Sequence, residues 1–134
     1  MAIAALITYL ITAVGGFILL GTWVAKGGHR RDGGTSSHLN PGLVFGHFLL
    51  AVAGLVLWIA YLAVDTVGLA WAAVAVLVVV AVLGFTMFAR WVPQVRGTHS
   101  AATVERQFPV VVVLGHGLFA ATTLVLALIA AATA

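Results

Sequence analysis

The sequence predicts an all-α integral membrane protein built as a four-helix up-down bundle, and two observations carry this prediction. Hydrophobic residues make up 63% of the 134 residues and charged residues only 7%, whereas a soluble domain carries about 25% charged residues. The chain also contains four apolar runs, and a helix needs about 20 residues to cross a bilayer. The runs lie at roughly residues 2–25, 41–64, 69–91 and 108–132 of a single membrane domain, residues 1–134.

The first run starts directly after Met1 and contains no Lys or Arg. A secretory signal peptide begins with a basic segment, so we expect this run to be retained as a membrane span. A polar, glycine-rich loop from Lys26 to Asn40 follows. Asn40 and Pro41 suit the start of the second helix, because Asn is a favoured N-cap and Pro is tolerated at the first helical position.

The second and third runs are joined by the short connection Asp65-Thr66-Val67-Gly68, which predicts an antiparallel helical hairpin. We expect the third helix to end near Trp91, because Pro93 cannot continue a helix without losing a backbone hydrogen bond. A second polar loop over residues 94–107 precedes Pro109, which marks the start of the fourth helix. Residues 110–113 are all Val, yet a helix remains the better prediction, since a strand edge in lipid leaves backbone groups unsatisfied.

Basic residues predict the orientation, because Lys and Arg gather in cytoplasmic loops. The two longer loops and their borders hold all six basic residues, whereas the connection at 65–68 holds none. Together with the wealth of Ala, Val, Leu and Gly, this suggests a bacterial cytoplasmic membrane protein with both termini outside and both basic loops in the cytoplasm. The basic residues are Lys26, Arg30, Arg31, Arg90, Arg96 and Arg106.

Residues near the span ends suit the membrane interface. The positions of Trp23, Trp58, Trp71 and Trp91 are typical of the aromatic belts at the two membrane surfaces. His29, His38 and His99 lie in the loops, where we expect solvated residues near anionic lipid, with a loop zinc site between His29 and His38 as the alternative.

Two Gly-His pairs place an ionisable side chain inside apolar runs. Gly46-His47 lies in the second run and Gly115-His116 in the fourth. Polar residues within membrane spans are expensive and raise a functional question. The offset of the two histidines, 116 − 47 = 69, also relates Gly15 to Gly84. The repeated spacing indicates either that the bundle is a duplicated two-helix hairpin or that the match arose by chance, because such matches arise easily in this composition.

The two histidines are expected at matching depth in neighbouring parts of the bundle. His47 follows Pro41 by six residues and His116 follows Pro109 by seven, which places each about 9–11 Å from its helix start. The second and fourth helices are diagonal in an up-down bundle, about 11–14 Å apart. That space suits two inward imidazoles with a haem iron between them. We therefore predict a single-haem electron-transfer protein, with His47 and His116 as axial ligands of haem b.

Other residues are expected to support the haem. Gly46 and Gly115 would reduce the bulk beside each imidazole, and Arg90 would contact the haem propionates. Thr86 and Thr122 are candidate hydrogen-bond partners near the rings.

Two further roles stay open. A histidine in a span can bond a neighbouring helix and help the bundle to pack, which favours a non-enzymatic structural or assembly subunit of a larger respiratory membrane complex. A small ion or metal carrier is the third role. The expected partners are the lipid bilayer and either such a complex or further copies of the chain.

The chain has no Cys, which excludes thiolate metal sites and iron–sulfur clusters held by it, and no motif suggests a hydrolase, nucleotide binding or nucleic-acid recognition.

Residues 84–91 (Gly-Phe-Thr-Met-Phe-Ala-Arg-Trp), residues 105–109 (Glu-Arg-Gln-Phe-Pro) and the two Gly-His pairs together resemble a group of small, uncharacterised four-span proteins from actinobacteria. This resemblance covers nearly the whole chain and implies no activity. One His in each of two spans is also similar in plan to membrane b-type cytochromes, including the cytochrome b561 and haem A synthase classes. By that analogy His47 and His116 would be axial ligands. Many of those proteins use four His for two haems, whereas the two in-span His here allow one.

Overall fold

The computed structural model describes residues 1–30, 37–97 and 103–134. Four long helices follow one another, α1 (Ala2–Ala25), α2 (Pro41–Val64), α3 (Val67–Val95) and α4 (Val110–Ala132), with the short 3₁₀ helix η1 (Val104–Gln107) before α4. Each long helix is long and apolar enough to cross a membrane, and the described ranges contain no strand. The prediction of an all-α four-helix membrane bundle is confirmed, while Arg31 and His99 lie outside the described residues.

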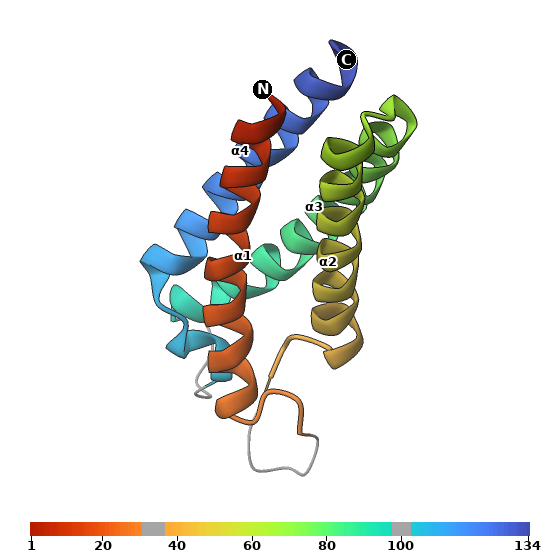
Figure 1. Cartoon of the computed structure of the whole chain (residues 1–134). Helices are drawn as coiled ribbons and strands as arrows, with labels where there is room; N and C mark the ends of the chain where they lie inside the picture. Colours follow the sequence, from red (N-terminus) through yellow and green to blue (C-terminus); the bar gives the residue numbers. More distant parts are fainter. Residues whose placement is uncertain (31–36, 98–102) are drawn as a thin grey trace.

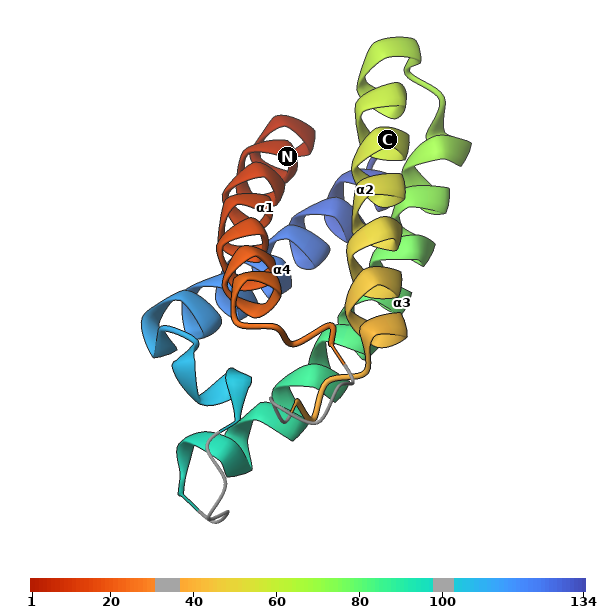
Figure 2. The ribbon, with the colours of Figure 1, turned by 90° about the horizontal axis from the view of Figure 1, so that it is seen from below.

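The helices run up and down and form two pairs. Both termini and the α2–α3 connection lie at one end of the bundle, which we call the terminal end, and the two longer connections lie at the other, the loop end (Figure 1). α1 packs along α4, and α2 packs along α3 (Figures 1 and 2). The pairs meet where α3 contacts α4 and α1 contacts α2, whereas no described Cα of α2 lies within 8 Å of one of α4. α2 and α4 are therefore diagonal, as expected.

The hairpin of α2 and α3 has the expected sequence signals at the start of α2 and at the connection between the two helices. Asn40 caps α2, since its side-chain oxygen accepts a hydrogen bond of 2.8 Å from the Gly42 N–H, and Pro41 is the first helical residue. Asp65 ends α2 in the left-handed backbone region, with φ 51°. A residue with a short polar side chain tolerates that conformation better than most residues do. The left-handed conformation lets the chain reverse its direction over the two residues between α2 and α3.

The expected end of the third helix near Trp91 is wrong, because α3 continues through Pro93 to Val95. Hydrogen bonds made by residues on both sides of Pro93 stabilise this extra turn. The Trp91 indole N–H donates to the Glu105 carbonyl at 3.1 Å, and the Gln94 side-chain oxygen accepts from the Thr103 hydroxyl at 3.3 Å. These bonds to η1 and to the residue before it offset the hydrogen bond that Pro93 cannot make.

The fourth helix starts at Val110, two residues later than expected, because the segment before it has its own structure. Pro109 is the N-cap of α4 rather than its first residue. Phe108, Val104 and Glu105 are buried, so this part of the polar loop folds back and closes the loop end of the bundle. The segment expected to be a polar loop is therefore partly buried.

Buried side chains form two clusters, one toward each end of the bundle. The terminal-end cluster includes Tyr9, Trp58, Tyr61, Ala73, Leu77 and Ala127. The loop-end cluster includes Trp23, Leu39, Val44, Trp91, Val104 and Phe108. The expectation of aromatic belts is wrong for three of the four tryptophans, because Trp23, Trp58 and Trp91 are buried and each indole N–H donates a hydrogen bond inside the bundle. Trp71 is exposed.

Candidate functional site

His47 of α2 and His116 of α4 face each other inside the bundle. Their ring centroids lie 6.3 Å apart, and the ring planes are inclined by 61°. The sequence predicted that the two side chains lie at one depth on diagonal helices. The structure adds that both turn inward, which the spacing along the chain did not determine.

Each imidazole is held by a backbone carbonyl of the helix with which its own helix is paired. Nδ1 of His47 lies 3.0 Å from the Val80 carbonyl oxygen of α3, and Nδ1 of His116 lies 2.9 Å from the Thr12 carbonyl oxygen of α1. A carbonyl oxygen can only accept, so each Nδ1 carries the hydrogen and donates it. In the neutral ring, Nε2 then keeps its lone pair and can bind a metal.

Glycines on the neighbouring helices admit the two rings. A Cβ added at Gly84 would lie 3.2 Å from Cε1 of His47, and one added at Gly16 would lie 3.1 Å from Cε1 of His116. A Cβ at Gly15 would lie 3.3 Å from Cβ of His116. These distances are shorter than ordinary carbon contacts, which are about 3.5–4.0 Å, so any side chain at these positions would push against an imidazole.

The glycines chosen from the sequence have a different environment. A Cβ added at Gly46 or at Gly115 would meet no atom within 4 Å. Gly46 and Gly115 each precede their histidine in the chain, but the imidazole ring points toward the neighbouring helix and does not approach either glycine. The glycines that contact the rings therefore come from α1 and α3, and their signal in the sequence was the offset that relates Gly15 to Gly84.

The two helix pairs repeat one local arrangement. Each Nδ1 donates to a carbonyl four residues before the glycine that its Cε1 approaches, Val80 before Gly84 and Thr12 before Gly16. These contacts make Gly16 the counterpart of Gly84, and the offset between them (84 − 16 = 68) is one residue shorter than the offset of 69 between the two histidines. A duplicated hairpin predicts such a repeat, with an axis along the membrane normal.

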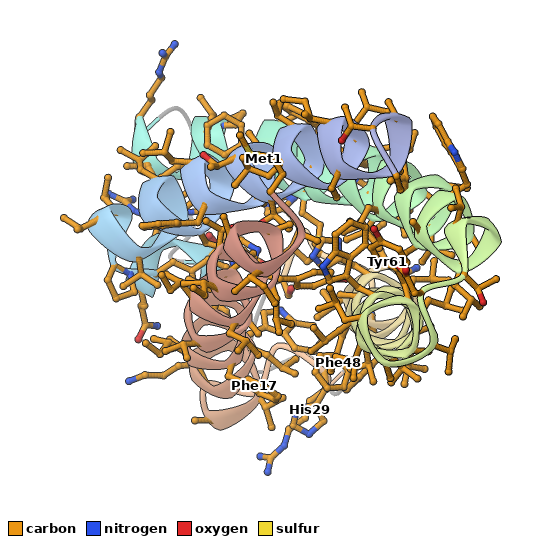
Figure 3. All side chains as sticks on the ribbon, turned by 45° about the horizontal axis from the view of Figure 1, so that its top comes forward. Met1, Phe17, His29, Phe48 and Tyr61 are labelled. Carbon is orange, nitrogen blue, oxygen red and sulfur yellow. The ribbon has the colours of Figure 1, made fainter. Side chains whose placement is uncertain are left out.

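The layer of the bundle around the histidines contains no buried side chain. On α1, α2 and α3, burial stops on one side of this layer and resumes on the other, whereas on α4 it begins only at Thr123. Phe17 and Phe48 pack against each other beside it, with ring centroids 5.6 Å apart, where α1 faces α2 (Figure 3). The bounding buried residues are Thr12 and Trp23 on α1, Val44 and Gly54 on α2, Val80 and Trp91 on α3, and Thr123 on α4.

The separation of the two rings is compatible with two imidazoles that would bind one metal ion. An imidazole nitrogen binds a transition metal at about 2.0 Å and lies about 1 Å from its ring centre, so two rings on opposite sides of one metal have centres about 6 Å apart. The observed separation is 6.3 Å. Haem supplies four ligands of its own, so two protein ligands suffice. The Nδ1–H bonds to carbonyls are the usual outer contacts of metal-binding histidines.

The remaining residues expected at the site lie elsewhere. Arg90 is exposed, and its guanidinium donates to the His38 carbonyl at 3.4 Å. It lies six residues after Gly84, which turns it about 120° away from the helix face that meets His47. The Thr86 and Thr122 hydroxyls donate to carbonyls of their own helices, Val82 and Leu118, so carbonyls rather than these threonines hold the rings.

Glu105 is a functional candidate that the sequence did not single out. Its side chain is fully buried at the loop end. One carboxylate oxygen accepts from the Ser37 hydroxyl and, at 3.2 Å, from the Leu39 N–H. The other has no hydrogen-bond partner in the part of the chain that the structure describes. The available signal was the apolar pair Val104 and Phe108 on either side of a charged residue.

No protein-family model, curated protein or solved structure matches this chain.

Proposed function

We propose that this protein is a membrane electron carrier that binds one haem b through Nε2 of His47 and Nε2 of His116. One observation carries the proposal, which is the pair of inward imidazoles with centroids 6.3 Å apart and both Nδ1 atoms engaged by carbonyls. Haem iron held by two histidines supplies one-electron oxidation and reduction. With both axial positions taken by protein, substrate chemistry at the iron is not expected.

The chain's own residues perform three tasks in this proposal. The carbonyls of Val80 and Thr12 fix the tautomer and the ring orientation of the histidines. Gly16 and Gly84 let the rings lie close to α1 and α3. Apolar clusters lie toward both ends of the bundle, and apolar surroundings limit the access of water to a bound metal and so influence its reduction potential.

The test is the absorption spectrum of the detergent-purified protein, oxidised and then reduced with dithionite. We expect one haem per chain, with a Soret band and with α and β bands that sharpen on reduction. His47→Ala and His116→Ala should each lose the chromophore or its low-spin bands, whereas His29→Ala in the loop should keep both. His29 is a matched control, because it is an exposed histidine of the same chain.

Two results would overturn the haem proposal. One is a folded, colourless protein that comes from haem-sufficient cells and takes up no added haemin. The other is an unchanged low-spin spectrum in both His47→Ala and His116→Ala, because the haem would then be held elsewhere.

A structural or assembly subunit of a larger membrane complex is the second candidate, and the same hydrogen bonds favour it. His47 ties α2 to α3 and His116 ties α4 to α1, and such bonds help helices to pack in lipid. This role predicts a colourless protein that copurifies with larger subunits. A small ion carrier would instead require bound ion at the two histidines, so metal analysis of the same preparation separates the third role.

The proposed location is the bacterial cytoplasmic membrane, with the loop end in the cytoplasm and both termini outside. The described basic residues outside the spans lie at the loop end, and cytoplasmic loops gather such residues. Redox partners would then be subunits of a respiratory complex or further copies of this chain. Cysteine accessibility at Gly97 and at Thr133 would test the orientation, because the two positions lie toward opposite ends of the bundle.

A further inference from the structure

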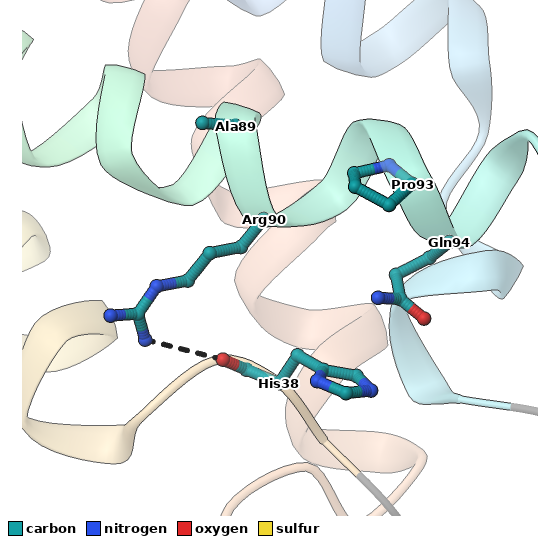
Figure 4. Close-up of a pocket in the computed structure, with 5 residues that line it drawn as sticks. All are labelled: His38, Ala89, Arg90, Pro93 and Gln94. Atoms are coloured by element: carbon teal, nitrogen blue, oxygen red, sulfur yellow. Dashed lines mark hydrogen bonds between the residues drawn. The ribbon is translucent and has the colours of Figure 1, made fainter. Parts of the chain in front are cut away.

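A second site lies at the loop end, on a different face of α3 from the histidines. Arg90, Pro93, Gln94 and Ala89 of α3 and His38 before α2 line a hollow with a volume of 380 Å³ (Figure 4). The three polar residues come from two segments far apart in the sequence. Their side chains surround one space, although no feature of the sequence marks them as a group.

The hollow is positively charged and rich in hydrogen-bond donors. Within the described ranges, the Arg90 guanidinium donates a hydrogen bond of 3.4 Å to the His38 carbonyl, and no described carboxylate oxygen lies within 4.0 Å of it. Gln94 is buried, and its side-chain oxygen is occupied by Thr103. Its amide nitrogen therefore remains to face the hollow, and Figure 4 shows that nitrogen turned toward His38.

The surroundings add to this positive charge. Lys26, Arg30, Arg96 and Arg106 are exposed near the loop end. The single carboxylate described at this end belongs to Glu105, which is buried and bonded to Ser37 and Leu39. An anion that enters the hollow thus meets positive potential without an exposed acid nearby in the described ranges.

The hollow lies close to the loop-end limit of the apolar surface of α3. The exposed apolar residues Phe85 and Phe88 come just before Arg90, and only Val95 follows it among the large exposed apolar residues of α3. Arginine at such a border reaches the phosphate layer and binds phosphate through two parallel N–H groups.

We propose that this hollow binds the phosphate of an anionic phospholipid, for which phosphatidylglycerol is the probe. Arg90 supplies the charge, and the Gln94 amide supplies a further hydrogen-bond donor. The proposal does not depend on haem binding, because neither His47 nor His116 lines the hollow.

Native mass spectrometry of the delipidated protein tests this proposal. The probes are phosphatidylglycerol, phosphatidylcholine and inorganic phosphate, each added separately to the wild-type chain. We expect phosphatidylglycerol adducts that resist collisional activation longer than phosphatidylcholine adducts. In Arg90→Gln, retention should fall about tenfold, as expected for the loss of one charge-assisted hydrogen bond. Arg96→Gln, which removes the same charge from an exposed residue outside the hollow, should leave retention unchanged.

A second variant keeps the test independent of Arg90. Ala89→Trp fills the hollow from an exposed position and leaves every charge in place, so it should also displace phosphatidylglycerol. Equal losses in Arg90→Gln and Arg96→Gln would refute the site in favour of general surface charge. Strong adducts of inorganic phosphate without lipid preference would refute the lipid as ligand, and retention in Ala89→Trp would refute the hollow as its location.

Discussion

Replacing Gly84 by Leu tests the packing on which the histidine site depends. The added Cβ would lie 3.2 Å from Cε1 and 3.8 Å from Nδ1 of His47, and Leu has three further carbon atoms. The ring must leave its place, and the 3.0 Å bond from Nδ1 to the Val80 carbonyl is lost. Hydrogen bonds of this length tolerate little stretching, since their ordinary range ends at about 3.2 Å.

The magnitude follows from three opposing terms. Overpacking a well-packed contact costs about 1–3 kcal/mol, and an interhelical hydrogen bond in a membrane contributes about 0.6 kcal/mol. Leu is a better helix former than Gly, which returns about 0.8–1.0 kcal/mol. We therefore expect Gly84→Leu to lower the free energy of unfolding by about 0.6–2.8 kcal/mol.

Gly115→Leu is the matched control, because it makes the same substitution next to the other histidine where an added Cβ meets no atom within 4 Å. Only the gain in helix propensity applies there, so the control should be as stable as the wild type or more stable. The assay is unfolding in mixed detergent and SDS micelles, followed by circular dichroism. Haem content is measured in parallel and should fall in Gly84→Leu alone. Stabilities of the two variants within about 0.5 kcal/mol of each other, the spread of ordinary surface substitutions, would refute the packing argument.

Three further variants test contacts elsewhere in the bundle. Tyr9→Phe removes the hydroxyl that donates to the Ala51 carbonyl at 2.7 Å and should cost about 0.6–1.7 kcal/mol of unfolding free energy in SDS titration; no change would mean that this bond between α1 and α2 is absent in micelles. Glu105→Gln should be at least as stable as the wild type, because it keeps an acceptor for the Ser37 hydroxyl and the Leu39 N–H. Glu105→Ala should lower the free energy of unfolding by about 1–3 kcal/mol. A thermal unfolding experiment in which Glu105→Ala is the more stable of the two variants would contradict this account. Thr123→Val removes the bond to the Thr8 hydroxyl at 2.9 Å and should lower stability by less than about 1 kcal/mol with haem content unchanged, and a loss of haem would contradict the separation of this contact from the histidine layer.

The histidine pair shows how far reasoning from the sequence reaches at a site. Their equal depth follows from the distances to Pro41 and Pro109 and from the fixed rise of a helix. Their contact does not follow, because rotation of each helix about its own axis is set by packing against neighbours. The carbonyl partners Val80 and Thr12 also could not be predicted, since every residue has a backbone carbonyl and its side chain gives no sign of which one is used.

The loop end shows the opposite limit. Pro93 and a polar composition predicted a helix end followed by a polar loop, and local propensity supports that prediction. The buried contacts of Trp91, Gln94 and Glu105 override it, because they join residues 9 to 68 positions apart that meet only once the bundle has formed. The grouping of Arg90 with His38, 52 residues away in the chain, arises for the same reason.

The sequence by itself determined the class of this protein, the number of its spans, the hairpin and the depth of its two inner histidines. These features depend on composition and on spacing along one helix, where bilayer thickness and helix rise leave few alternatives. Only the tertiary structure decided which faces meet, which glycines admit the imidazoles, and that a buried carboxylate lies at the loop end. In apolar helices of nearly uniform hydrophobicity, close packing and a few hydrogen bonds select the contacts between helices, and both depend on atoms brought together from different parts of the chain.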